Sequence, residues 1–374
     1  MAKHRYRVLI AGGGTGGHVY PALAIIDGLR EKGSFEFLYV GGNGGIETRI
    51  VPPREIPLEA IWISGFARSL SLKNLLFPIK LAVSMVQSWQ IIRKFRPDVA
   101  VGTGGYVSGP VMYVAARRGV PVLIQEQDVY PGITTRLLAR YARRICLSFA
   151  AAQEHLSPHR AKLTVTGNPV RAGLAGANRV AAREKWQLQA DKMTLLIFGG
   201  SQGARAINRA MAAILPEILA ESELQVLWQT GSSQYQDVCD RYPEPPDTVK
   251  IVPYIDDMSE AYAAADLIVS RAGANSLAEL AVVGRPAILV PYPYAAGDHQ
   301  AHNSRMVEAQ GAALMVEEGD GWEQKLSEAL RRLIADGDLR ASQEKAWQAL
   351  ARPQATADIV AEIIKLIANS TLRP

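Results

Sequence analysis

Short apolar segments alternate with segments of helix length along nearly the whole chain. In the first half, apolar segments of strand length occur at residues 8–11, 35–40, 98–101, 120–124, 144–148 and 163–166. The pattern begins again in the second half, at residues 194–198, 225–228, 249–252, 267–270 and 287–290. Buried strands separated by helices are typical of a parallel sheet with helices on both faces. The sequence therefore predicts an α/β chain with two doubly wound, Rossmann-like units.

The length of the chain supports this division. With 374 residues the chain is too long for one compact core and fits two domains. The string GNPVR at residues 167–171 reads as a linker and predicts units at residues 1–168 and 169–352. Residues 357–367 near the end have helical apolar spacing and can cover either unit. Two facing units would bind ligands at the carboxyl ends of their strands, in the cleft between them.

The composition of the chain limits the kinds of binding partner and the cellular compartments that we expect. The formal net charge of +5 fits an anionic partner, either a phosphorylated substrate or an anionic lipid surface, and equally fits a basic soluble protein without such a partner. No basic run is interleaved with aromatic residues, so we expect no nucleic-acid binding. The only cysteines, Cys146 and Cys239, exclude a disulfide scaffold and fit a reducing cytosol. We find no signal peptide and no apolar stretch of about 18 residues, and therefore expect a soluble protein or one at a membrane surface.

The first glycine turn, Gly12 to Gly17, lies between a predicted strand and a predicted helix and is followed by His18. Such a turn lets backbone N–H groups surround a phosphate at a helix N-terminus. A dinucleotide site is disfavoured because the second predicted strand ends in glycines instead of a ribose-binding carboxylate. A Walker loop is excluded because no Lys-Ser/Thr pair follows the glycines. Because histidine can move a proton near neutral pH, the turn indicates chemistry on a phosphorylated substrate.

Further glycine turns follow other predicted strands, at residues 102–110 and 199–204. Two turns side by side in the first unit can hold both phosphates of a pyrophosphate, although glycines can also simply permit tight turns. Residues 270–280 repeat the strand, turn and helix pattern and carry Glu279, whose carboxylate can accept hydrogen bonds from two ribose hydroxyls. Polar residues at 297–303 begin another helix, where sugar hydroxyls can bind.

Several strings together carry a specific resemblance. They are GGGTGGHVYPALA, VGTGGYVSGP, QEQDVYPG, GNPVR, FGGSQGAR, YIDDM and SRAGANSLAELAVVGRPAILVPYPYAAGDHQAHN. Because these strings occur in this order along the chain, the chain resembles the GT-B class of nucleotide-sugar glycosyltransferases. Within that class it is similar to the family that transfers N-acetylglucosamine from UDP-GlcNAc to the lipid-linked muramyl-pentapeptide, lipid I, and so forms lipid II for peptidoglycan. The resemblance covers nearly the whole chain.

The resemblance implies roles for individual residues. It assigns the donor contacts to Thr15, Gly16, Gly17, Asp128, Arg171, Ser201, the backbone of Ile255, Ala274, Asn275, Ser276, Leu277, Ala278, Glu279 and Gln300. The candidates for the acceptor pyrophosphate are Gly13, Gly14, Gly104, Gly105 and Tyr106. Residues 1–168, with the terminal helix 353–374 packing back on them, would form the acceptor and membrane unit. Residues 169–352 would bind UDP-GlcNAc.

The implied reaction is one direct displacement that inverts the anomeric carbon. His18 is the candidate base, and its alternative role is only to bind acceptor phosphate or orient the loop. Glu126 is a second, weaker candidate base. We expect no metal, because no Asp-x-Asp string appears in the donor loops, and no cofactor; the adjacent Asp256 and Asp257 are predicted to cap a helix. The family usually has Asn where this chain has Asp128, which leaves the role of that residue open.

The lipid acceptor also implies a membrane contact. The stretch from Leu70 to Phe95 is rich in apolar and aromatic residues and has a basic fringe that extends from Arg68 to Arg96. This composition is typical of an interfacial surface or of an ordinary packed helix with exposed lysines. We expect peripheral binding at the cytoplasmic face of the bacterial plasma membrane. The rival functions are a UDP-GlcNAc epimerase of the same architecture and a non-catalytic membrane recruiter. A non-catalytic recruiter would lack the donor-binding motifs, and the second half of the chain contains the complete set of them, so this alternative is disfavoured.

Overall fold

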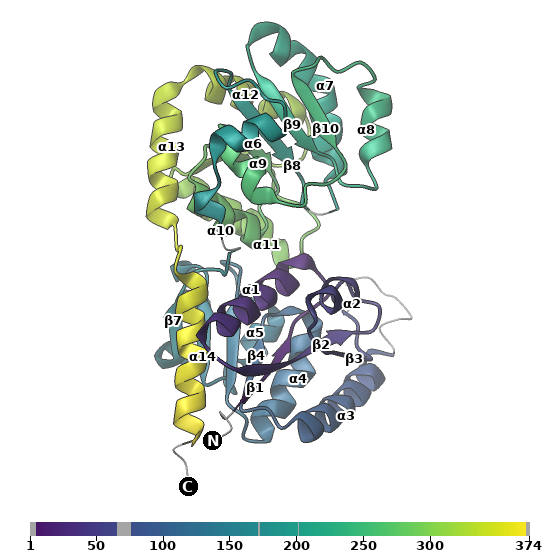
Figure 1. Cartoon of the computed structure of the whole chain (residues 1–374), viewed down its shortest axis with the longest axis vertical. Helices are drawn as coiled ribbons and strands as arrows, with labels where there is room; N and C mark the ends of the chain where they lie inside the picture. Colours follow the sequence, from purple (N-terminus) through teal and green to yellow (C-terminus); the bar gives the residue numbers. More distant parts are fainter. Residues whose placement is uncertain (1–4, 66–75, 171–172, 201, 372–374) are drawn as a thin grey trace. The chain divides into compact units, whose positions relative to one another are not determined.

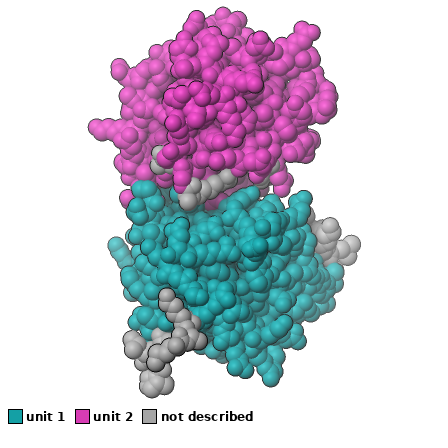
Figure 2. Space-filling model, in the orientation of Figure 1, with its two compact units in different colours: residues 1–170, 353–374 teal, residues 171–352 magenta. Residues whose placement is uncertain are grey.

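The computed structural model describes residues 5–65, 76–170, 173–200 and 202–371. The chain divides into two compact units (Figure 2). Unit 1 comprises Met1–Val170 and Pro353–Pro374, and unit 2 comprises Arg171–Arg352. Each unit contains one parallel sheet with helices on both faces. The predicted fold class, two doubly wound α/β units, is confirmed.

The sheet of unit 1 has the strand order β3-β2-β1-β4-β5-β6-β7, and every pair of neighbours is parallel. Its strands are β1 (Tyr6–Ala11), β2 (Phe35–Gly42), β3 (Leu58–Ile61), β4 (Val99–Gly102), β5 (Val122–Glu126), β6 (Arg144–Leu147) and β7 (Leu163–Val165). In the register of the central strand, Val8 of β1 lies between Phe37 of β2 and Val99 of β4. The edge strand β3 was not predicted from the sequence.

Helices cover the sheet of unit 1 on both faces (Figure 1). They are α1 (Gly16–Lys32), α2 (Glu47–Ile50), α3 (Phe77–Phe95), α4 (Gly105–Arg117), α5 (Ile133–Leu138) and α14 (Ala355–Thr371). Because side chains alternate along a strand, Val8 and Ile10 pack in the core under α1 and α14, whereas Leu9 and Ala11 pack in the core under α4. The terminal helix α14 therefore completes the core of unit 1, and it packs against α1.

The sheet of unit 2 has the order β10-β9-β8-β11-β12-β13 and is also parallel. Its strands are β8 (Thr194–Phe198), β9 (Gln225–Gln229), β10 (Val249–Val252), β11 (Leu267–Ser270), β12 (Ala287–Leu289) and β13 (Ala313–Met315). Its helices are α6 (Arg179–Lys185), α7 (Arg205–Glu221), α8 (Tyr235–Arg241), α9 (Met258–Ala264), α10 (Ala274–Val283), α11 (His299–Ala309), α12 (Trp322–Ala335) and α13 (Gly337–Leu350).

The two sheets share one topology, and this topology predicts where along the carboxyl ends of the strands each unit binds a ligand. In both units the chain builds three strands outward in one direction and then continues from the other side of the first strand. The order therefore reverses between β1 and β4 in unit 1, and between β8 and β11 in unit 2. Doubly wound sheets bind ligands outside the carboxyl ends of the strands at such a point. The predicted glycine and small-residue turns follow these four strands.

Candidate active site

In unit 1 the two glycine turns meet at His18, which lies in the first turn of α1. The His18 Nδ1 atom lies 3.1 Å from the carbonyl oxygen of Thr103, and the Thr103 hydroxyl donates to the carbonyl of His18 at 2.8 Å. A carbonyl oxygen only accepts, so this hydrogen bond requires the proton on Nδ1. The lone pair of the neutral ring is then on Nε2, the arrangement that a general base needs. The sequence did not indicate Thr103.

The close approach of the turns depends on the absence of side chains at Gly104 and Gly105. A Cβ atom on Gly104 would lie 2.6 Å from His18 Nδ1, and one on Gly105 would lie 2.3 Å from the carbonyl oxygen of Gly13. Helix α4 begins at Gly105, so its first N–H groups are at this edge of the sheet. The Tyr106 ring packs on Gly14, and burial together with the nearby Glu47 carboxylate raises the pKa of the Tyr106 hydroxyl. Its hydroxyl therefore stays protonated and can donate to an anion.

Glu47 is a buried carboxylate beneath the first glycine turn that sequence reasoning missed. It accepts hydrogen bonds from the N–H groups of Gly42 at 2.7 Å and Gly14 at 3.1 Å. A Cβ atom on Gly13, Gly41 or Gly45 would lie within 2.5 Å of its side chain. These glycines make room for Glu47. The signal in the sequence was the string GGNGGIE after the second predicted strand.

This arrangement changes how the first turn can bind an anion. The N–H of Gly14 already donates to Glu47, and the carboxylate adds negative charge under Gly13 and Gly14. A second anion at these two residues would be repelled. The donors that suit the acceptor pyrophosphate are therefore those at the start of α4, at Gly105 and Tyr106.

The second candidate base, Glu126, is buried at the end of β5 and organises the following loop. Its two carboxylate oxygens accept the N–H groups of Asp128 at 3.1 Å and Gly132 at 3.2 Å. Burial, and secondarily the charge of Asp128, raise the pKa of Glu126 to about 7. Because both oxygens already hold the loop, the geometry favours His18 over Glu126 as the base.

The raised pKa of Glu126 predicts a pH-dependent stability. A buried acid with a raised pKa favours folding while it is protonated, so its contribution is complete below its unfolded pKa near 4.5. That contribution should be lost as pH rises through about 7, a change of about 3 kcal/mol. Denaturant unfolding between pH 4.5 and pH 7.5 measures it, with Glu126→Gln as the comparison. Equal pH dependence in both proteins would contradict the assignment.

In unit 2, Gln229 at the end of β9 connects the glycine turn after β8 with Ile255, a predicted donor contact. Its Nε2 donates to the carbonyl of Gly200 at 3.0 Å, and its Oε1 accepts the N–H of Ile255 at 3.3 Å. The Ile255 side chain is buried, so the Ile255 carbonyl is the group suited to a nucleobase edge. The predicted helix cap at Asp257 is confirmed, since its carboxylate accepts the N–H of Ser259 at 2.9 Å.

Helix α10 presents its N-terminus at the reversal of the sheet. It begins at Ala274, after a turn of three residues that follows β11, and the last of these, Gly273, has no side chain that could cap the helix. The N–H groups of the first residues, Ala274 to Ser276, suit a phosphate. Leu277 is buried and its N–H donates to the carbonyl of Gly273, so this residue offers a ligand neither side chain nor amide. The half-buried Ala278 is in the same turn.

Two polar side chains follow on the same unit. Glu279 is 8% exposed, and one of its carboxylate oxygens accepts from the Tyr262 hydroxyl at 2.9 Å. Gln300, at the start of α11, accepts the N–H of Tyr292 with Oε1 at 2.9 Å. This bond leaves the donating Nε2 of Gln300 to bind hydroxyl oxygens.

The structure thus places most of the predicted site residues in two groups, one in each unit, at the carboxyl ends of the strands. Around the start of α1 in unit 1 it gathers Gly13, Gly14, Thr15, Gly16, Gly17, His18, Gly104, Gly105 and Tyr106. Unit 2 holds Ile255, the start of α10 and Gln300. The predicted donor contacts Arg171 and Ser201 lie outside the described residues. Within the described ranges, no group of three or more His, Cys, Asp and Glu side chains could hold a metal ion.

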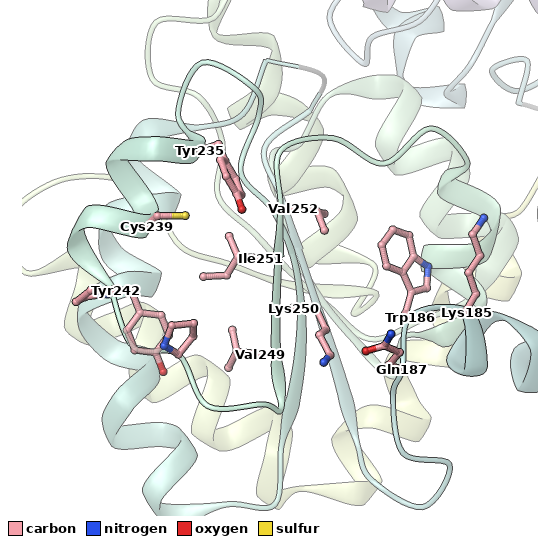
Figure 3. A pocket seen from close by; sticks show the side chains of 12 residues that line it. Lys185, Trp186, Gln187, Tyr235, Cys239, Tyr242, Val249, Lys250, Ile251 and Val252 are labelled. Carbon is pink, nitrogen blue, oxygen red and sulfur yellow. The ribbon is translucent and has the colours of Figure 1, made fainter.

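A pocket of about 500 Å³ lies elsewhere in unit 2, along the edge strand β10 (Figure 3). Val249 and Ile251 point to the side of α8, and Val252 points to the side of Trp186. None of the predicted site residues lines this pocket. It is therefore separate from the candidate site.

Comparisons with known proteins decide the family. Residues 8–147 match the glycosyltransferase family 28 N-terminal domain, and residues 194–360 match the glycosyltransferase family 28 C-terminal domain. A relative from Desulforamulus reducens is 42% identical, over 96% of this chain and 99% of its own length. It is named UDP-N-acetylglucosamine–N-acetylmuramyl-(pentapeptide) pyrophosphoryl-undecaprenol N-acetylglucosamine transferase. The chain belongs to this transferase family.

Comparison with solved structures shows that this chain shares its fold with a transferase of the family and with an epimerase. The crystal structure of Acinetobacter baumannii MurG has 31% identity and a TM-score of 0.76, covering 97% of this chain and all of that one. A UDP-N-acetylglucosamine 2-epimerase has 13% identity and a TM-score of 0.65, covering 99% of each chain. The epimerase shares the fold alone. The resemblance to the N-acetylglucosaminyltransferases of the GT-B class, inferred from the sequence strings, is confirmed.

Proposed function

We propose that this protein transfers N-acetylglucosamine from UDP-GlcNAc to the 4-hydroxyl of the muramyl-pentapeptide in undecaprenyl-pyrophosphoryl lipid I, forming lipid II. The observation that carries the proposal is the 42% identity to the Desulforamulus reducens transferase over almost the full length of both chains. The geometry of His18 supports it, because a transferase of this kind needs a base at the acceptor hydroxyl. No geometry of the described residues favours the epimerase instead.

In this proposal unit 1 binds the acceptor and unit 2 makes most of the donor contacts, while Thr15, Gly16 and Gly17 of unit 1 stay candidate contacts to the donor. The acceptor pyrophosphate binds at the start of α4, near Gly105 and Tyr106, in unit 1. In unit 2 the uracil meets the Ile255 backbone, the diphosphate meets the start of α10, the ribose meets Glu279, and Gln300 binds the GlcNAc hydroxyls. Asp128 remains a candidate contact in the loop that Glu126 holds.

The reaction is a single displacement. The acceptor oxygen bonds to the anomeric carbon, and the bond from that carbon to the UDP oxygen breaks with inversion. The acceptor proton passes to His18 Nε2, the nitrogen left unprotonated by the Thr103 hydrogen bond. The negative charge that develops on UDP is stabilised by the N-terminus of α10.

A product assay with the full chain tests this function. We expect UDP release from UDP-GlcNAc only when a lipid-pyrophosphoryl muramyl-pentapeptide is present, together with a disaccharide product. Appearance of UDP-N-acetylmannosamine without an acceptor would instead identify an epimerase. UDP release unchanged by the acceptor would contradict transfer to it.

We also propose that unit 1 binds the anionic surface of the membrane through α3. The residues of α3 that face the core include Ser84 and Ser88, whereas Ile79 and Val86 are 54% and 57% exposed. The exposed Trp89 lies under the guanidinium of Arg93 at 5.2 Å. An apolar face with a cationic fringe suits the headgroup region of a bilayer. Residues 70–75 of the predicted interfacial stretch, and Arg68 of its basic fringe, lie outside the described residues.

This contact would be peripheral. Among the described residues, no helix is sufficiently long and apolar to cross a bilayer. We place the protein at the cytoplasmic face of the bacterial plasma membrane, where UDP-GlcNAc and lipid I would meet it. Nucleic acid has no part in the proposed function.

The double variant Ile79→Asp/Val86→Asp should reduce binding to vesicles that contain phosphatidylglycerol by at least about tenfold, because it places two charges in the apolar layer. Co-sedimentation with vesicles measures this binding. Val180→Asp is the matched control, since Val180 is 64% exposed but belongs to unit 2. Undiminished binding of the double variant would contradict the proposed surface.

A further inference from the structure

Tyr262 of α9 joins three elements of unit 2, and its side chain is only 1% exposed. Its ring packs edge-on against Phe198, with 5.8 Å between the ring centroids and 80° between the planes. Its hydroxyl donates to Glu279 Oε2 at 2.9 Å. One buried side chain therefore contacts both the end of β8 and the helix α10.

The elements that Tyr262 joins carry or directly adjoin candidate donor contacts. Phe198 is the last residue of β8 and directly precedes the turn that contains Gly199 and Gly200. Helix α9 itself follows the segment that contains Ile255. Glu279 lies in the second turn of α10, beyond the N–H groups that suit the diphosphate. Tyr262 thus lies in α9, a few residues after Ile255, and contacts Phe198, before the turn that follows β8, and Glu279 of α10.

We infer that Tyr262 is a positioning residue for donor recognition, which orients the Glu279 carboxylate toward the ribose hydroxyls. The inference rests on the proposed function. An ionised carboxylate only accepts hydrogen bonds, so the Tyr262 hydroxyl is the donor. The two oxygens of a carboxylate together offer about four acceptor positions, so the bond to Tyr262 does not by itself prevent Glu279 from accepting bonds from ribose hydroxyls. A charge-assisted bond of this kind holds a flexible glutamate in one orientation.

The inference predicts a loss of ribose recognition when the hydroxyl alone is removed. Tyr262→Phe keeps the ring against Phe198 and removes the donor to Glu279. We expect the full-length variant to bind UDP about tenfold more weakly by calorimetry. The preference of the wild-type protein for UDP over 2′-deoxy-UDP should shrink by a similar factor. At saturating UDP-GlcNAc, kcat should change by less than about twofold, because the lost interaction serves binding.

A matched control separates this effect from the loss of any buried hydroxyl. Ser88→Ala also removes one buried hydrogen bond, from the Ser88 hydroxyl to the Ser84 carbonyl at 2.7 Å, but Ser88 lies in α3 of unit 1, outside every candidate donor contact. The affinity of Ser88→Ala for UDP should equal that of the wild-type protein. If both variants bind UDP equally weakly, a positioning role of Tyr262 is refuted.

A double-mutant cycle with Glu279→Gln distinguishes the inference from the proposed function. We expect Tyr262→Phe to weaken UDP binding in the wild-type background and to have little further effect in Glu279→Gln. If Glu279→Gln loses ribose preference while Tyr262→Phe keeps it, the inference is wrong and the ribose assignment stands. If Glu279→Gln itself retains wild-type affinity and ribose preference, the assignment of Glu279 fails, and the inference fails with it.

Discussion

Replacement of His18 by alanine should lower kcat for transfer by about 10²–10⁴-fold and leave the affinity for UDP unchanged. The imidazole is the group that accepts the acceptor proton in the proposed reaction, and the Thr103 carbonyl fixes which nitrogen does so. The His18 imidazole is not among the proposed contacts to UDP, most of which are in unit 2, so the affinity for UDP should not depend on this side chain. Steady-state transfer rates and calorimetry with UDP measure the two quantities.

His159→Ala is the control for this experiment. His159 is a half-buried histidine of unit 1 that lies outside both glycine turns. Its replacement should leave transfer unchanged. If His18→Ala turns over at the wild-type rate, His18 is not the base, and Glu126→Gln becomes the next variant to examine.

Replacement of Gly203 by alanine should destabilise unit 2 by at least about 3 kcal/mol. Gly203 has a φ of +77°, and a Cβ atom there would lie 1.9 Å from the carbonyl oxygen of Thr230. Neither the backbone conformation nor the space accepts a side chain. Hydrogen exchange of β8 and β9 measures the loss locally, which a chain of two units requires.

Gly200→Ala separates the two causes of this loss. Gly200 is in the same turn with a φ of +88°, but a Cβ atom there meets no heavy atom within 4 Å. We expect this variant to lose only about 1–2 kcal/mol, the cost of the left-handed conformation. Equal losses in both variants would show that the approach of the turn to Thr230 is not tight.

Most strands were predictable from the sequence, whereas the edge strands β3 and β13 were not. The bounds of β10 and β11 agree with the predicted segments, because each is a short, mainly apolar segment, interrupted in β10 only by Lys250. Strand β3 has two exposed residues, Glu59 and Ala60, and so lacks an apolar run. Strand β13 has three residues and forms beside β12. Pairing with a neighbour, not local pattern, creates such strands.

The candidate site was predictable only in part. The turns were predictable because glycines after an apolar strand are a local signal. The sequence did not show that a carboxylate lies beneath the first turn. The glycines after β2 make room for the Glu47 side chain there. Asp128 likewise acts partly through its neighbour, because its charge raises the pKa of Glu126. A sequence lists such residues without showing which of them meet.

The amino-acid sequence by itself determined the α/β class, the repeat of the pattern in two units and the placement of the turns after strands. These properties follow from apolar periodicity and glycine position within short segments. Only the tertiary structure decided the protonated nitrogen of His18, through a carbonyl 85 residues away, and the partner of Glu279, a hydroxyl 17 residues away. Contacts of this kind depend on strand order and helix packing, which bring distant residues within hydrogen-bond range.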